Sequence, residues 1–214
     1  MRELVGLHAP SWCDATLRGI DWLGEADAAW TDPDAELYRA QLPGFLDRFG
    51  ARLDAESRRI IARVGAATSG PPFLPLATPF ALVHVDYRLD NLLIDDRVDP
   101  PRVTAVDWQT VGLGSPLADV AYFLGAGLEP EVRRGAEESI VRDYHRGLTT
   151  AGVGDYAWPA CWTDYRRGAF AGFRITVVAS MIVQQTERGD EMFTVMARRH
   201  SRHALDLGAE EFLG

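Results

Sequence analysis

The chain has 214 residues, of which 47% are hydrophobic and 25% are charged, a balance typical of a folded globular protein and not of a disordered chain. Its formal net charge of −9 argues against nucleic acid or an anionic membrane as the main partner, because both attract basic surfaces. All 22 residues counted as lysine or arginine are arginines, so no step can depend on a lysine ammonium, whether in a Schiff base or against a phosphate.

The N-terminal part of the chain is predicted to be helical. Residues 1–9 are typical of the last turns of a helix that stops at Pro10, so we expect the chain to open in mid-element. Asp32 is expected to cap a second helix and Asp54 to cap a third. Residues 68–79 are rich in proline and predict a connector to the rest of the chain.

Strand-like runs follow this connector. Short apolar stretches at residues 81–84, 92–95 and 103–108 predict three β-strands, of which the last two are separated by a turn segment. We expect 92–95 to pair antiparallel with 103–108, which would bring the end of the third strand back to the loop between the first two. The segment with Gly112 and Gly114 predicts a turn and not a phosphate loop, since it has neither a GxGxxG pattern nor a Walker lysine.

After the strands, apolar periodicity predicts helices over residues 117–124, from Pro130 onward, over 158–186 and over 190–206. The helix from Pro130 is expected to bury a stripe formed by Val132, Ala136, Ile140, Tyr144 and Leu148. The most apolar segment, residues 169–183, is short and carries Arg174, so we expect a buried helix there and not a membrane span. The fold class predicted from these elements is α+β and mostly helical.

The cysteines indicate the compartment. Cys13 and Cys161 are far apart and form no CxxC pair, which predicts reduced thiols instead of a disulfide framework or a zinc site. The N-terminus has no charged-then-apolar signal pattern. Together these features predict a cytoplasmic protein.

Polar side chains gather around the predicted strands. His84, Asp86 and Asn91 lie in the loop between the first two strands, and Asp107 ends the third. Asn91 is the only asparagine in the chain. Carboxylate and amide oxygens suit Mg²⁺, which takes one or two protein carboxylates and completes its shell with phosphate oxygens and water. The spacing H-x-D-x-x-x-x-N, followed by an aspartate on a strand, is typical of phosphoryl transfer.

Two longer motifs carry a family resemblance. LVHVDYRLDNLLID and VTAVDWQTVGLGSPLADVAYFLG resemble the catalytic core of the aminoglycoside phosphotransferase and choline-kinase-like enzymes, and are most similar to the ecdysteroid-kinase-like branch. The likeness extends over essentially the whole chain. It implies a protein-kinase-like C-terminal lobe in which a small antiparallel β element carries the catalytic loop. It also implies ATP-dependent, Mg²⁺-requiring phosphorylation of a hydroxyl group.

The resemblance implies a role for each motif residue. Asp86 would be the catalytic base, and His84 would brace the catalytic loop. Asn91 and Asp107 would bind the cofactor as magnesium ligands. Asp119, in SPLADVAYF, would anchor the loop from the following helix. One departure is a valine at position 85, where relatives usually have glycine, and a β-branched residue there restricts the backbone.

The family also has an N-terminal lobe with a nucleotide-covering loop and a lysine, and the sequence has neither. We therefore expect residues 1–214 to form a single domain that corresponds to the C-terminal lobe alone, in a truncated family member. One alternative is a non-catalytic pseudokinase-like remnant or binding module. Another is a metal hydrolase that uses His84, Asp86 and Asp107, although the sequence offers no clear second imidazole for it.

The expected partner is a small molecule with a hydroxyl group. The acidic chain suits a cationic or polyhydroxylated substrate, whereas Trp12, Trp158 and Trp162 suit a pocket for an apolar alcohol. If a lobe is missing, the face that would meet it should expose apolar surface. Such a surface favours a homodimer or association with another chain.

Overall fold

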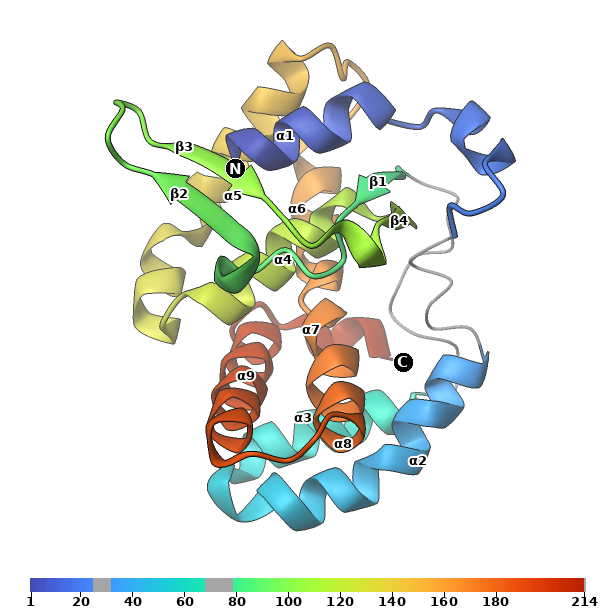
Figure 1. Ribbon diagram of the computed structural model, residues 1–214, viewed down its shortest axis with the longest axis vertical. Helices are drawn as coiled ribbons and strands as arrows, with labels where there is room; N and C mark the ends of the chain where they lie inside the picture. The colour runs from blue at the N-terminus through green and yellow to red at the C-terminus, as the bar shows by residue number, and fades with distance from the viewer. Residues whose placement is uncertain (25–31, 68–78, 214) are drawn as a thin grey trace.

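The computed structural model describes residues 1–24, 32–67 and 79–213. Figure 1 shows α1, β1 and the β2–β3 hairpin toward one end, α2, α3, α8 and α9 toward the other, and α4 and α7 between them. The helices are α1 Arg2–His8, α2 Asp32–Phe49, α3 Ala55–Ala66, α4 Pro116–Gly127, α5 Pro130–Thr150, α6 Trp158–Gly168, α7 Ala171–Arg174, α8 Ser180–Ile182 and α9 Glu187–Asp206. The strands are β1 Ala81–Val83, β2 Leu92–Asp95, β3 Arg102–Ala105 and β4 Gly112–Gly114. The predicted α+β, mostly helical fold is confirmed.

Short 3₁₀ turns and one π-helical turn complete the described secondary structure. The 3₁₀ segments are Ala9–Ser11, Ala15–Gly19, Gly50–Arg52, Leu89–Asn91, Trp108–Thr110 and Ala209–Leu213, and the π-helical turn is Ile175–Ala179. Side-chain caps begin α3, where Asp54 accepts a hydrogen bond from the Ser57 amide at 2.7 Å, and α9, where Thr186 accepts one from the Gly189 amide. These caps satisfy amides that have no partner inside the helix.

The strands form two separate antiparallel pairs. β2 pairs with β3 in the register Leu92 with Ala105, which confirms the pairing expected from the sequence. β1 pairs with β4, so Gly112 and Gly114 lie in a strand and not in the predicted turn. The strand prediction for residues 103–108 was too long, because β3 ends at Ala105.

The helical prediction for residues 158–186 was wrong as a single element. The chain leaves the helix after Gly168 and continues through α7, the π-helical turn and α8. A β-carbon on Gly168 would lie 2.7 Å from the carbonyl oxygen of Leu117, so this glycine permits the close approach of α6 and α4. The predicted Pro-rich connector at 68–79 lies almost entirely outside the described residues.

The buried stripe of α5 also differs from the prediction. Tyr144 and Leu148 are buried as expected, but Val132 is 58% exposed. Arg133 is buried in its place, and its guanidinium pairs with the carboxylates of Asp206 and Glu137. A buried arginine is stable only when such partners compensate its charge, and apolar periodicity cannot reveal them.

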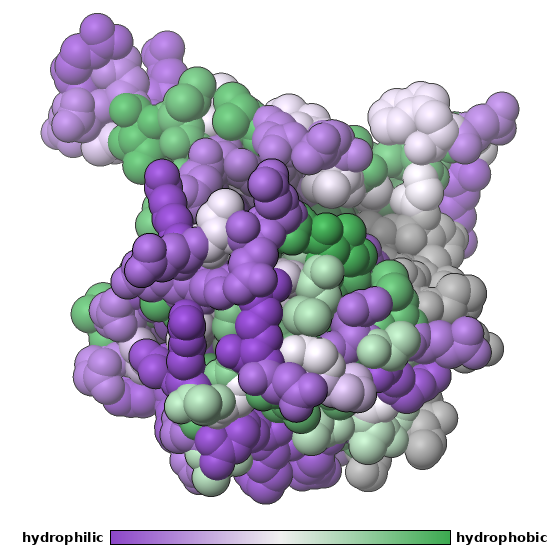
Figure 2. Space-filling model, turned by 60° about the horizontal axis from the view of Figure 1, so that its bottom comes forward, coloured by the Kyte–Doolittle hydropathy of each residue, from purple (hydrophilic) through white to green (hydrophobic). Residues whose placement is uncertain are grey.

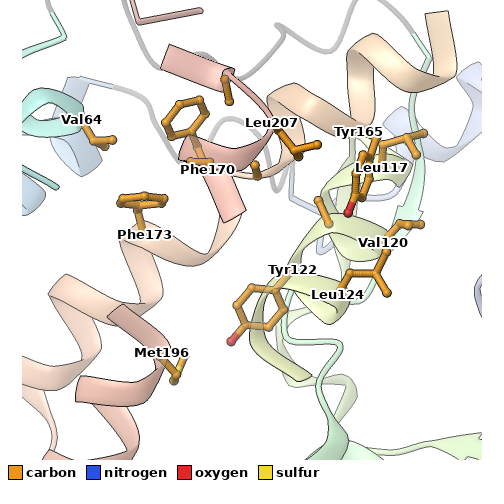
Figure 3. Packing of buried hydrophobic residues seen from close by; sticks show 14 of the residues in the cluster. Val64, Leu117, Val120, Tyr122, Leu124, Tyr165, Phe170, Phe173, Met196 and Leu207 are labelled. Atoms are coloured by element: carbon orange, nitrogen blue, oxygen red, sulfur yellow. The ribbon is translucent and has the colours of Figure 1, made fainter. Parts of the chain in front are cut away.

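One continuous apolar core connects the helices. It gathers buried side chains from α1 through α7 and α9, and Figure 3 shows how part of it packs between α4, α6, α7 and α9. The described parts of the chain include no helix with the length and hydropathy to cross a membrane. Leu93 and Ile94 of β2 are 61% and 57% exposed, so the hairpin presents apolar side chains to solvent. Figure 2 shows one face of the molecule, on which hydrophobic patches lie among mostly hydrophilic residues.

Candidate active site

Asp119 organises the loop that follows β1. Its Oδ2 accepts a hydrogen bond from the His84 amide at 2.7 Å, and its Oδ1 accepts one from the Val85 amide at 2.9 Å. Asp119 lies in the first turn of α4 and is 1% exposed. A buried carboxylate that accepts two backbone N–H groups fixes the direction of the chain at those residues. The loop therefore leaves β1 along a path that α4 determines.

His8 supports the same carboxylate from α1. Its Nε2 lies 3.4 Å from Oδ2 of Asp119, and its Nδ1 lies 2.7 Å from the hydroxyl of Tyr144. Because the carboxylate only accepts, Nε2 carries a proton and donates it to Asp119. His8 is fully buried and packs behind the loop. Its contact with Asp119 spans 111 positions and leaves no local signal in the sequence.

The ring of His84 connects the loop to the segment after β3. Its Nε2 donates to the carbonyl oxygen of Val106 at 2.9 Å, and its ring lies 4.7 Å from that of Trp108. Thr110 donates to the carbonyl oxygen of His84 at 2.8 Å. His84 is fully buried, so these contacts form the interior of the site.

Asn91 and Asp86 bind each other directly. The Asn91 Nδ2 donates to the Asp86 carboxylate Oδ2 at 3.0 Å and to its backbone carbonyl at 2.9 Å. Since the side-chain nitrogen of Asn91 is bonded inside the loop, its side-chain oxygen Oδ1 is the atom available to a cation. The second carboxylate oxygen, Oδ1, accepts from the hydroxyl of Tyr122 at 2.9 Å. Sequence reasoning missed Tyr122, which resembles an ordinary apolar core position of α4.

Asp107 lies next to a backbone contact between the segment after β3 and the loop. The backbone amide of Val106 donates to the backbone carbonyl oxygen of Asn91 at 2.9 Å, and Asp107 is the next residue along the chain. Asp107 has φ of +65° and an exposed side chain. The sequence placed it at the end of a strand, but it lies two residues beyond β3, in a left-handed conformation that aspartate tolerates better than most residues.

The residues suggested for a magnesium site fit such an ion chemically. Asn91 offers an amide oxygen and Asp107 a carboxylate, a donor set that suits Mg²⁺ when phosphate and water complete its shell. Among residues 1–24, 32–67 and 79–213, no three His, Cys, Asp or Glu side chains form a metal cluster.

Val85 also has a left-handed backbone, with φ of +72°. This conformation costs an L-residue roughly 1–2 kcal/mol, and a β-branched side chain fits it poorly. We expect Val85→Gly to raise the free energy of unfolding by about 1 kcal/mol, as measured by urea denaturation. Val103→Gly, in the extended strand β3, should lower it. A Val85→Gly protein less stable than the wild type would contradict this account of the strain.

A groove lies beside the loop. It has a volume of about 460 Å³. Its lining comes from the loop, the end of α4 and residues 188–199 of α9, and includes Arg88, Leu89, Ala126, Met192 and Met196. Its apolar side chains are accompanied by charges of both signs, since Arg188, Arg199, Asp90 and Glu191 also line it. Trp158 and Trp162 lie against each other and against the core instead of lining this groove.

The chain matches known proteins at two levels. Residues 8–160 match the family described as the phosphotransferase enzyme family. Over 173 residues the chain is 31% identical to mouse "Acyl-CoA dehydrogenase family member 10". This match covers 67% of the chain but only 15% of the much longer mouse protein. No solved structure matches. The family match covers the loop with His84, Asp86 and Asn91, the segment with Asp107, and the anchor Asp119, and on this evidence the chain belongs to the phosphotransferase enzyme family, with an α+β, kinase-like fold.

Proposed function

We propose that this chain transfers the γ-phosphoryl group of Mg²⁺-bound ATP to a hydroxyl group of a small molecule. The observation that carries the proposal is the fixed carboxylate of Asp86. One of its oxygens is held by Tyr122 and the other by Asn91, and each oxygen keeps a further lone pair for a hydroxyl proton. The free thiols of Cys13 and Cys161 suit the reducing cytoplasm, where ATP is available.

In the proposed reaction the acceptor hydroxyl approaches Asp86, which takes its proton as the new oxygen–phosphorus bond forms. The bond between the γ-phosphorus and the β–γ bridging oxygen breaks, and ADP leaves. Asn91 and Asp107 would hold Mg²⁺, which neutralises the charge of the triphosphate when it is bound. His84 and Asp119 keep the loop in place through the contacts described above.

The groove beside the loop supports a small acceptor with an apolar body. Leu89, Met192, Val195 and Met196 give it apolar walls, while its arginines and carboxylates lie on the same lining. Pockets of this composition bind small molecules by apolar burial and orient them with a few polar groups. The matched mouse protein is named as an acyl-CoA dehydrogenase, but the match covers too small a part of it to transfer that activity.

The test is phosphoryl transfer from γ-labelled Mg-ATP to a panel of alcohols that includes amino alcohols, aminoglycosides and apolar hydroxy acids. We expect wild-type protein to label at least one class, and Asp86→Ala to lower the rate about 100-fold or more. Asp107→Ala should have a similar effect, because it removes a carboxylate from the proposed magnesium site. Asp96→Ala, on the exposed hairpin turn, is the matched control and should keep the wild-type rate.

Two results would contradict the proposal. One is equal transfer by the wild type and Asp86→Ala. The other is binding of nucleotide or alcohol without any turnover by the wild type, which would favour a binding module. This second function is considered because the chain has no lysine, the residue that holds the nucleotide phosphates in kinases.

A further inference from the structure

Tyr122 is a buried tyrosine whose hydroxyl group serves the loop instead of the core. Its side chain is 1% exposed, and Figure 3 shows its hydroxyl directed away from Leu117 and Val120. The hydroxyl donates to Oδ1 of Asp86 at 2.9 Å. Burial and the nearby Asp86 carboxylate raise the pKa of Tyr122 far above its usual range, while Arg88 acts in the opposite direction. Tyr122 therefore stays a neutral donor.

The ring of His200, on α9, lies behind Tyr122. The two rings are stacked, with centroids 5.3 Å apart and planes at 11°. Burial lowers the pKa of His200 to about 3, so the imidazole is neutral. Both ring nitrogens are buried and neither has a hydrogen-bond partner in the described chain. The contact of His200 with Tyr122 is thus one of packing.

Two glycines leave room for this imidazole and enclose it. A β-carbon on Gly172 would lie 2.2–2.4 Å from three atoms of the His200 ring, and one on Gly125 would lie 2.9 Å from its Nδ1. Backbone therefore approaches His200 from both α7 and α4. An aromatic stack enclosed in this way cannot shift far without a clash, so α7 and α9 together set the position of the Tyr122 ring.

From this arrangement we infer that Tyr122 is a positioning residue for the proposed phosphoryl transfer, holding the Asp86 carboxylate in the orientation that receives the acceptor proton. Asn91 fixes the same carboxylate through its other oxygen. With both oxygens bonded, rotation of the carboxylate breaks at least one hydrogen bond. This inference rests on the proposed function, and it adds a residue outside the HxDxxxxN motif to the site.

The kinetic test compares Tyr122→Phe with Tyr38→Phe. Tyr38 is a fully buried tyrosine that donates to the carbonyl oxygen of Ile61 at 3.0 Å, so the control also loses one buried hydrogen bond. The probe is Mg-ATP hydrolysis, in which water replaces the acceptor alcohol. We expect Tyr122→Phe to lower kcat about tenfold or more with little change in the KM for ATP, because the base is misoriented while the nucleotide still binds. Tyr38→Phe should leave kcat close to that of the wild type.

An activity-free measurement accompanies the kinetics. Tyr122→Phe, Asp86→Ala and the double variant form a double-mutant cycle, in which urea denaturation gives the equilibrium constant of unfolding of each protein. If the two side chains interact, the constant of the double variant should differ about threefold or more from the value obtained by multiplying the two single effects. Additive effects would overturn the contact. An unchanged kcat in Tyr122→Phe, or an equal fall in Tyr38→Phe, would overturn the positioning role. Absence of hydrolysis and transfer by the wild type would instead overturn the proposed function, and the cycle would still decide the contact.

Discussion

Asp119→Ala is expected to lower the free energy of unfolding by about 3–5 kcal/mol and to reduce the rate of the proposed phosphoryl transfer strongly. The substitution leaves the buried amides of His84 and Val85 without their acceptor, and each such group costs roughly 1–3 kcal/mol. The Nε2–H of His8 loses its partner as well. Because Asp86 follows these amides directly, the loop loses the path that brings its carboxylate to the acceptor, and the rate should fall at least about 100-fold.

Urea denaturation followed by circular dichroism measures the first effect, and label transfer at a temperature where the variant is folded measures the second. Asp143→Ala is the control, since Asp143 is exposed and pairs with the neighbouring Arg146 along α5. It should change stability by less than about 0.5 kcal/mol. Asp119→Asn keeps one acceptor oxygen and should lie between the wild type and Asp119→Ala. Equal stability of Asp119→Ala and Asp143→Ala would show that the carboxylate does not hold the loop.

Gly172→Ala is expected to lower the free energy of unfolding by about 3 kcal/mol. The added methyl group would overlap three atoms of the His200 imidazole, which is 1% exposed and stacked on Tyr122. The methyl group can be accommodated only if the ring or the helices around it move. Overpacking of a core typically costs about 1–3 kcal/mol, and the threefold overlap predicts the upper end of that range. Any shift of the stack also displaces Tyr122, so activity should fall together with stability.

The same substitution at Gly135 is the control. Gly135 is exposed on α5, and a β-carbon there meets nothing within 4 Å, so Gly135→Ala should raise stability by roughly 0.5–1 kcal/mol through helix propensity. The two variants thus have opposite predicted signs in thermal or urea unfolding. Adding His200→Ala to Gly172→Ala should recover part of the lost stability, because the methyl group then fills the space of the ring. If Gly172→Ala unfolds like the wild type, the enclosure of His200 is not rigid.

The sequence predicted correctly those features that depend on residues close together in the chain. The spacing of His84, Asp86 and Asn91 is local, and it placed the three in one loop that the structure confirms. The pairing of β2 with β3 followed from two apolar runs on either side of a turn. Both signals depend on short stretches of chain, where sequence separation and spatial separation agree.

Long-range contacts left no such signal. Tyr122 resembles a core residue, and only the folded chain shows that its hydroxyl reaches Asp86. The strand β4 consists of Gly-Leu-Gly, which has low strand propensity and is extended because β1 pairs with it. The helix α6 ends at Gly168, where its backbone lies close to Leu117 of α4, and the periodicity of one helix cannot reveal such a contact.

The convergence of His8, the loop and α4 on Asp119 has a consequence for how the protein is made. α1 leaves the ribosome long before its partner, because 111 residues separate His8 from Asp119. At about 5–20 residues per second, roughly 5 to 20 seconds pass between their synthesis. Until Asp119 has been synthesised, neither His8 nor the amides of His84 and Val85 can bind its carboxylate. The loop that carries the HxDxxxxN motif can therefore reach this conformation only after α4 has been synthesised.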